Sequence, residues 1–248
     1  MPTLILTPRH TDDSQALWRV AVARGWRVER LTTWRVPEEL CAVADPVLYV
    51  EALFGPTLAA QLGVELLDPP EDWLPRLPRE YRRREVAMAT LGEARRRGEP
   101  AFVKPPNDKS FPAAVYAPAE LPPDFSDDMA VLIAEPVRFR SEFRGFVLDR
   151  EIRTVSLYSK DGELATDEPP TAEEEEQLGA WTRSFLADRS VGLPRACVLD
   201  VGWIEGRGWA VVELNAAWGA GLYRCDPGPA LDVIHGATLP RTGERRPG

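Results

Sequence analysis

The chain has 248 residues, of which 44% are hydrophobic and 28% charged, and its formal net charge is −9. This composition is typical of a globular protein with enough apolar material for a core, and the acidic balance argues against a non-specific nucleic-acid binder. The three cysteines lack metal-ligand spacing, no apolar run has the length of a membrane span, and the N-terminus does not resemble a signal peptide. We therefore expect a cytoplasmic protein without a disulfide framework or a membrane partner.

The first 78 residues predict a small α/β lobe with a mostly parallel sheet. Asp12 to Ser14 can cap its first helix, which Gly25 ends. No glycine-rich phosphate loop occurs there. The predicted strands cover residues 3–7, 26–31, 46–53 and 64–67, and the predicted helices cover 15–24 and 56–62.

A proline-rich stretch, residues 69–78, marks the predicted end of this lobe, and a helix is predicted over residues 79–97. Only three lysines occur in the chain, and two of them, Lys104 and Lys109, flank the loop after a predicted strand. A site that keeps lysine where arginine is otherwise used can need a compact ammonium group, although chance placement explains the pattern equally well. Further predicted strands cover residues 101–104, 113–117 and 130–137.

A hairpin is predicted over residues 141–158, with its turn at Asp149 and Arg150. In that register, opposed residues have numbers that sum to 299, so Glu142, Arg144 and Arg153 share one face. Arg144 and Arg153 are then diagonal neighbours, close enough to bind one anion together. The alternative is an ordinary exposed face of alternating polar residues.

A helix over residues 171–189, whose acidic start complements the helix dipole, precedes a second hairpin over residues 197–223. A turn of two or four residues near Gly206 makes opposed residue numbers sum to 413. Asp200 then faces Glu213, and Asn215 points to the same side. Two opposed carboxylates repel each other, which predicts a cation such as Mg²⁺ between them. A three-residue turn would shift the register by one and separate the pair.

Five segments in a characteristic order carry a resemblance: FVKPPNDKSF, AEPV, SEFRGFV, CVLDVG and VVELNAAWGAGLY. With these segments the sequence resembles the ATP-grasp superfamily over roughly residues 80–235, most closely the clade named for one arginine and two lysines on the phosphates. The resemblance implies an α/β (α+β) ATP-grasp fold. Its expected parts are a pre-ATP-grasp α/β lobe (1–78), a subdomain with the phosphate lysines (79–136), a subdomain with the metal hairpin (137–237) and a flexible tail (238–248).

The resemblance also implies roles for individual residues. The expected ATP-binding residues are Arg84 (with Arg83 as the alternative), Lys104 and Lys109 for the phosphates, Glu135, Pro136 and Val137 as the hinge whose backbone recognises adenine, and Glu142 facing the nucleotide. The expected catalytic residues, at the γ-phosphate or the substrate carboxylate, are Arg144 and Arg153. The expected Mg²⁺ ligands are Asp200, Glu213 and Asn215.

The implied activity is that of an ATP- and Mg²⁺-dependent ligase, which joins a carboxylate to an amine through an acyl phosphate. The substrate is expected to be a small molecule or a peptide, and a homodimer is left open. The loop PPNDKS lacks the glycine pair of common family members, so a stiffer lid is expected. Two alternatives are a nucleotide-binding module without catalysis and a small-molecule kinase on the same scaffold.

Overall fold

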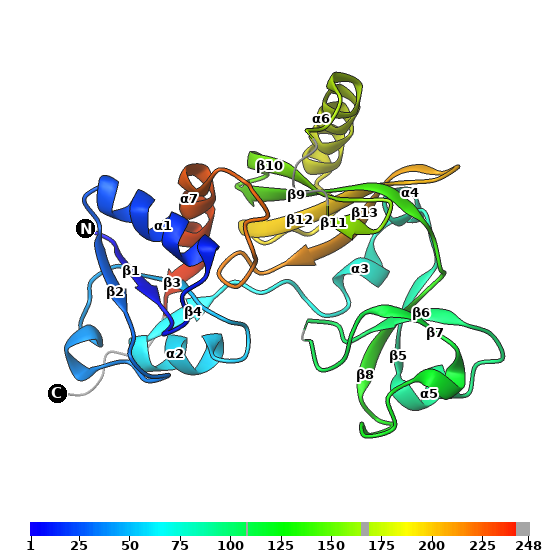
Figure 1. The fold of residues 1–248 in the computed structure, drawn as a ribbon, viewed down its shortest axis with the longest axis horizontal. Helices are drawn as coiled ribbons and strands as arrows, with labels where there is room; N and C mark the ends of the chain where they lie inside the picture. The colour runs from blue at the N-terminus through cyan, green and yellow to red at the C-terminus, as the bar shows by residue number, and fades with distance from the viewer. Residues whose placement is uncertain (108, 165–168, 242–248) are drawn as a thin grey trace.

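The computed structural model describes residues 1–107, 109–164 and 169–241. Figure 1 shows an N-terminal lobe on the left, a five-stranded sheet at the upper centre and a four-stranded sheet at the lower right. No helix among the described residues is long and apolar enough to cross a membrane. The strands are β1 (Thr3–Leu6), β2 (Arg27–Arg30), β3 (Pro46–Tyr49), β4 (Val64–Leu66), β5 (Val86–Thr90), β6 (Ala101–Lys104), β7 (Ala114–Tyr116), β8 (Ala130–Ala134), β9 (Phe139–Leu148), β10 (Glu151–Lys160), β11 (Glu163–Leu164), β12 (Ala196–Ile204), β13 (Gly208–Asn215) and β14 (Thr238–Pro240). The helices are α1 (Asp12–Ala23), α2 (Gly55–Leu62), α3 (Trp73–Arg76), α4 (Arg79–Arg82), α5 (Leu91–Arg95), α6 (Ala172–Ala187) and α7 (Pro227–Gly236), with short 3₁₀ turns at Glu38–Leu40 and Pro118–Glu120.

The predicted parallel sheet of the N-terminal lobe is confirmed. Its strand order is β2-β1-β3, and β1 is parallel to both neighbours. Helix α1 begins one residue earlier than the predicted cap, because the Thr11 hydroxyl accepts the backbone N–H of Ser14 and the Ser14 hydroxyl accepts that of Thr11. Gly25 follows the helix with φ +73°, a conformation that glycine adopts without a steric penalty.

Residues from the far end of the described chain complete this lobe. Helix α7 packs against α1, and β14 pairs antiparallel with β4, which lies outside the parallel sheet. The Thr238 hydroxyl accepts the backbone N–H of Leu48, 190 residues away in sequence. The prediction of a flexible tail is therefore wrong for Thr238–Pro240, whose backbone groups find partners in the lobe, and residues 242–248 lie outside the described residues.

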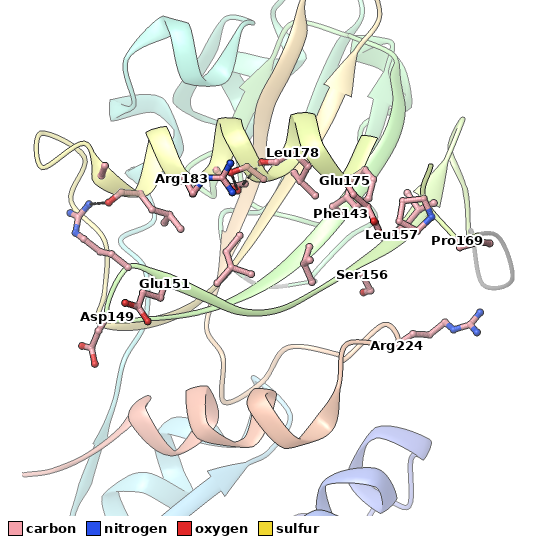
Figure 2. Close-up of a pocket in the computed structure, with 18 of the residues that line it drawn as sticks. Phe143, Asp149, Glu151, Ser156, Leu157, Pro169, Glu175, Leu178, Arg183 and Arg224 are labelled. Carbon is pink, nitrogen blue, oxygen red and sulfur yellow. Dashed lines mark hydrogen bonds between the residues drawn. The ribbon is translucent and has the colours of Figure 1, made fainter. Parts of the chain in front are cut away.

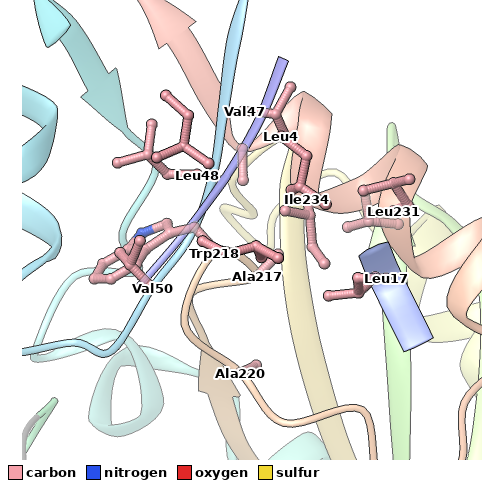
Figure 3. Packing of buried hydrophobic residues seen from close by; sticks show 14 of the residues in the cluster. Leu4, Leu17, Val47, Leu48, Val50, Ala217, Trp218, Ala220, Leu231 and Ile234 are labelled. Atoms are coloured by element: carbon pink, nitrogen blue, oxygen red, sulfur yellow. The ribbon is translucent and has the colours of Figure 1, made fainter. Parts of the chain in front are cut away.

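Trp218, from the loop after β13, joins this lobe to the rest of the protein (Figure 3). Its side chain is 3% exposed and packs in a cluster with Leu48, Val50 and Ile234. The Trp218 carbonyl accepts the backbone N–H of Val50 at 3.0 Å. A Cβ atom on Gly55 would lie 2.3 Å from the indole ring, so only glycine fits there. The loop that follows the second hairpin is therefore anchored in the N-terminal core.

The helix predicted over residues 79–97 is wrong. α4 ends at Arg83, whose φ is +47°, and the chain then enters β5, which pairs antiparallel with β8. Thr90 caps α5 together with Glu93. Residues such as Ala87 and Met88 favour helices, but the hydrogen bonds and side-chain burial of the sheet outweigh this weak preference. The resulting four-stranded sheet has the order β5-β8-β6-β7.

The five-stranded sheet has the order β11-β10-β9-β12-β13, with α6 packed on one face through Leu178 and Phe185. The predicted β9–β10 hairpin is present, but its predicted register holds only next to the turn. Val147 faces Ile152 as predicted, whereas Arg144 faces Ser156 after an irregularity between Ile152 and Thr154. Arg153 is the extra residue there, so it is not the predicted diagonal neighbour of Arg144.

Candidate active site

The β12–β13 hairpin places Asp200 directly opposite Glu213, as predicted, but by a different route. Ile204 pairs with Gly208, so the turn has three residues, which alone would separate the two carboxylates. A bulge between Asp200 and Val201 leaves Val212 as an extra residue of β13 and shifts the register back. The turn and the bulge cancel each other.

The bulge also decides which side of the sheet each side chain faces. Trp209, Val211 and Leu214 are buried in the core beneath α6, so the alternation along β13 is broken between Val211 and Leu214. Glu213 and Asn215 therefore face the opposite side, where the Asn215 Nδ2 donates to Asp200 Oδ2 at 3.1 Å and to Glu213 Oε1 at 3.0 Å. The three predicted metal ligands thus form one hydrogen-bonded group.

Arg144, on the neighbouring strand β9, holds Asp200 in a buried two-pronged ion pair. Its Nε donates to Asp200 Oδ1 at 2.9 Å and its Nη2 to Oδ2 at 2.6 Å, while Nη1 donates to the Gly221 carbonyl at 3.1 Å. Asp200 is 0% exposed, and this burial raises its pKa to about 7, against the opposing effect of Arg144. The rings of Tyr158 and Tyr223 lie 5.5 and 4.5 Å from the guanidinium carbon.

Lys104 approaches this group from the other sheet. Its Nζ forms an ion pair with Glu213 Oε2 and so links β6 to β13. Burial by itself would raise the pKa of Glu213, but Lys104, the Asn215 amide and Arg144 together lower it to about 2. The group of acidic and basic side chains therefore lies between the four-stranded and five-stranded sheets.

Glu142 lies on the same strand as Arg144, two residues earlier, and accepts a hydrogen bond from the Tyr158 hydroxyl at 2.9 Å. Burial raises the pKa of Glu142, while hydrogen bonds from Tyr158 and Ser159 act in the opposite direction. A Cβ atom on Gly202 of β12 would lie 2.8 Å from the Ser141 carbonyl oxygen and 3.2 Å from Glu142 Cγ. Glycine at this position leaves room for Glu142 beside the sheet.

The donor set fits a hard divalent cation. Asp200 and Glu213 supply carboxylates and Asn215 a side-chain amide, which are ligand types that Mg²⁺ accepts. The group already attracts two cationic side chains, Lys104 and Arg144. No set of three or more His, Cys, Asp and Glu side chains within the described ranges is arranged for a metal. A cation here would therefore depend on the amide and on ligands from outside the protein.

The hinge between the two sheets is tied to the tip of the β12–β13 hairpin. The Glu135 carboxylate accepts Arg207 Nη1 at 3.0 Å and Nη2 at 2.5 Å, and Arg83 and Arg207 each donate to the other's main-chain carbonyl. The Glu135 N–H donates to the Glu85 carbonyl at 2.9 Å. Arg207 lowers the pKa of Glu135 to about 2. The hinge segment is therefore held from both sides.

The Glu135 carboxyl is expected to stay ionised at pH 3, because its pKa lies well below the ordinary value of about 4.3. Carboxyl-carbon NMR during an acid titration measures this directly. The ion pair stabilises the fold above the ordinary pKa, and this contribution is lost as the pH falls towards about 2. In Arg207→Ala the titration midpoint should return towards about 4.3, and a wild-type midpoint near that ordinary value would contradict the prediction.

Other predicted site residues lie elsewhere. Arg84 is 6% exposed and donates Nη1 to the Val211 carbonyl at 2.7 Å and Nη2 to the Val212 carbonyl at 3.0 Å. Lys109 lies exposed on the loop between β6 and β7. Arg153 is partly exposed, with Glu151 at 3.8 Å, so the predicted anion site shared with Arg144 is not formed.

Two aromatic residues at the site were not predicted to contact Arg144. Tyr158 falls opposite Glu142 only because two irregularities shift the β9–β10 register, and no sequence signal marks either one. Tyr223 has φ +45° and belongs to a loop whose Leu222 N–H donates to Asp13 at 2.9 Å. The glycines before Tyr223 indicated an irregular loop, but not its attachment to α1.

A separate cavity of about 890 Å³ lies on the opposite face of the five-stranded sheet (Figure 2). Figure 2 shows α6 crossing the sheet, with Phe143, Leu157 and Leu178 among the residues around the space. Phe143 precedes Arg144 on β9, and successive strand residues face opposite sides. This cavity is therefore not part of the group around Asp200.

Comparisons with known proteins agree with this geometry. A family model of the ATP-grasp domain, described as family 2 of the clade named for one arginine and two lysines, matches residues 81–233. A search of the curated proteins gives no significant match. Three solved structures share the fold. ATP-grasp ligase PsnB, complexed with minimal precursor, is 17% identical with a TM-score of 0.56, and the match covers 94% of this chain and 98% of that one.

The D-alanine–D-alanine ligase from Bacillus anthracis is 14% identical with a TM-score of 0.56, and the match covers 95% of this chain and 96% of that one. Macrocyclase MdnC from Microcystis aeruginosa MRC, bound with precursor peptide MdnA, is 12% identical with a TM-score of 0.51, covering 95% and 98%. At such identities the likeness shows the fold alone, while the family model matches more than half of the chain. The order of the predicted motifs, the two facing sheets and this match together show that the chain belongs to the ATP-grasp family, in family 2 of the clade named for one arginine and two lysines.

Proposed function

We propose that this protein is an ATP- and Mg²⁺-dependent ligase that joins a carboxylate to an amine and forms ADP. One observation carries the proposal: Asp200, Glu213 and Asn215 form a single group on one sheet, and Lys104 reaches it from the other. A triphosphate bound between the sheets brings several negative charges, which must be neutralised and aligned for phosphoryl transfer. Two carboxylates and an amide suit the metal, and the ammonium group suits the phosphates.

The hinge narrows how adenine would be recognised. The Glu135 N–H is already bonded to Glu85, and Pro136 has no N–H to donate. Val137 is therefore our candidate for the main-chain donor to the base, with hinge carbonyls as acceptors. Glu142 would face the nucleotide, as the resemblance to the family implies.

The phosphates would be met by Lys104 and Lys109. Lys104 is paired with Glu213 in the structure, so binding would exchange this carboxylate for phosphate oxygens. Asp200, Glu213 and Asn215 would hold Mg²⁺, which supplies charge neutralisation and alignment of the phosphates. Arg144 has all three guanidinium nitrogens engaged with Asp200 and Gly221. We therefore assign it mainly to orienting Asp200 and the Gly221 loop, beside the place where the acceptor would bind.

The proposed reaction has two steps. A substrate carboxylate oxygen attacks the γ-phosphorus of ATP, the bond to the β-phosphate oxygen breaks, and ADP leaves. The amine nitrogen of the second substrate then attacks the acyl carbon, and inorganic phosphate leaves as the amine loses its proton. The net products are an amide or peptide bond, ADP and phosphate. PsnB and MdnC are each solved with a precursor, which in MdnC is a peptide, and we extend that substrate class, beside small molecules, to this protein.

The test is ATP turnover by purified protein with pools of carboxylates and amines, including peptides, followed by mass spectrometry of the products. The proposal predicts ADP and phosphate release that requires both an acceptor and Mg²⁺, together with a new amide. A phosphorylated product without an amide would identify a kinase instead. Nucleotide binding without ADP formation from any pair, including a metabolite extract, would identify a nucleotide-binding module and overturn the proposal.

A further inference from the structure

Arg84 makes an unusual contact between the two sheets. It lies just before β5 of the four-stranded sheet, yet its guanidinium reaches β13 of the five-stranded sheet. Nη1 donates to the Val211 carbonyl at 2.7 Å, and Nη2 donates to the Val212 carbonyl at 3.0 Å. The side chain is 6% exposed, and its guanidinium carbon lies 5.2 Å from the centre of the Phe139 ring. This buried cation therefore binds two successive carbonyls of one strand.

Successive carbonyls of a regular strand point to opposite edges, so one guanidinium can reach both only where the strand is irregular. Val212 is the extra residue of the β13 bulge, between the pairs Asp200–Glu213 and Val201–Val211. β13 is an edge strand, so its outer edge is open to a side chain. The planar fork of arginine matches two acceptors at once, whereas lysine offers one nitrogen.

The bulge controls where Glu213 points. Trp209 and Val211 face the core beneath α6, and without the extra residue Glu213 would follow them into that apolar core. Leu214 would turn outward in its place. The register beyond the bulge is therefore what brings Glu213 and Asn215 to the side of Asp200.

We infer that Arg84 is a positioning residue, which holds the Val212 bulge and thereby keeps Glu213 aligned with Asp200. The inference rests on the proposed function for the use of this alignment, while the alignment itself is a property of the free protein. It gives Arg84 a task different from the phosphate contact that the family resemblance implies. Nη1 and Nη2 both donate to main-chain carbonyls, and a phosphate would compete with these bonds.

The decisive variant is Arg84→Met, which keeps apolar contact with Phe139 but removes every donor. Arg83→Met is the matched control, because Arg83 also donates to a main-chain carbonyl of this hairpin, at Arg207 in the turn and not at the bulge. The first measurement uses NMR on the ligand-free proteins. Cross-strand NOEs between Asp200 and Glu213 should persist in Arg83→Met and disappear in Arg84→Met, while those between Trp203 and Trp209 persist in both.

The second measurement is ADP affinity with and without Mg²⁺. Arg84→Met should lose about 10- to 100-fold of the affinity gained from Mg²⁺, as is usual when support of metal ligands is removed, and bind ADP unchanged without metal. Unchanged NOEs with weaker metal-free ADP binding would make Arg84 a phosphate ligand and overturn the inference. Unchanged NOEs with only a lower melting temperature would overturn it too.

Arg84→Lys covers the case in which the methionine variant does not fold. It keeps the buried charge but offers one nitrogen, so it should show a weakened Asp200–Glu213 contact and an intermediate loss of the Mg²⁺ effect. Wild-type behaviour in both measurements would contradict the inference. If wild-type protein binds no nucleotide, the proposed function fails, whereas the NOE comparison still decides the role of Arg84.

Discussion

Arg144→Met is expected to destabilise the fold by about 3–5 kcal/mol, the usual cost of breaking a buried ion pair from one side. Asp200 is fully buried, and Arg144 supplies both hydrogen bonds of the fork that neutralises it. Without the guanidinium, the pKa of Asp200 should rise further, so the folded variant binds a proton that the unfolded chain releases. The deficit should therefore shrink as the pH is lowered towards the ordinary aspartate value of about 3.9. Urea unfolding at several pH values measures both effects.

The chain offers a matched control for this loss. Arg195 also forms a two-pronged ion pair, with Asp149 at 2.8 and 3.2 Å, but these side chains are 58% and 56% exposed. Arg195→Met should cost about 0–1 kcal/mol, because solvent already screens the exposed pair. Equal losses in Arg144→Met and Arg195→Met would show that burial does not make Asp200 dependent on Arg144.

Glu213→Gln is expected to reduce ADP formation about 1,000-fold, equivalent to ~4 kcal/mol of lost stabilisation of the transferring phosphoryl group. The substitution keeps the size of the side chain but removes the charge that faces Lys104 and would bind Mg²⁺. ADP affinity should also lose most of its dependence on Mg²⁺. This second readout, by calorimetry with and without the metal, does not require the acceptor substrate to be known.

The control for Glu213→Gln is Glu205→Gln, in the exposed turn of the same hairpin. It removes the same charge from the chain without touching the site, so turnover and the Mg²⁺ effect should remain at the wild-type level. Wild-type turnover in Glu213→Gln would mean that Glu213 is not part of the phosphoryl-transfer machinery. An equal loss in both variants would point to a general effect of charge.

The polar pattern of the second hairpin was sufficient to predict the pairing of Asp200 with Glu213, although the assumed turn was wrong. The bulge that corrects the register cannot be read from the sequence, because Val212 is β-branched and typical of a regular strand. Neither irregularity of the β9–β10 hairpin had a sequence signal either, which is why Arg153 was misplaced and Tyr158 was not assigned to the site. Alternation gives the face of a strand only up to the first bulge.

Long-range contacts decided the remaining differences. The helix predicted over residues 79–97 rested on local preference, whereas pairing of β5 with β8 decides its structure. Arg84 looked like one of three neighbouring surface arginines, and only β13 shows why it is buried. A cytoplasmic location, a homodimer and the absence of a nucleic-acid partner stay predictions, as do the phosphate contacts of Lys104 and Lys109.

The attachment of α7 and β14 to the N-terminal lobe has a consequence for biosynthesis. The backbone N–H of Leu48 has its hydrogen-bond partner in a residue that the ribosome adds 190 residues later, and Leu231 and Ile234 are buried in the same cluster as Leu4 and Leu17. Until those residues emerge, the nascent lobe exposes apolar surface of the kind that chaperones bind. Because the polypeptide between these two segments carries both sheets, the lobe closes only after the residues of the candidate site have been made. Folding of the N-terminal lobe is thereby coupled to completion of the site.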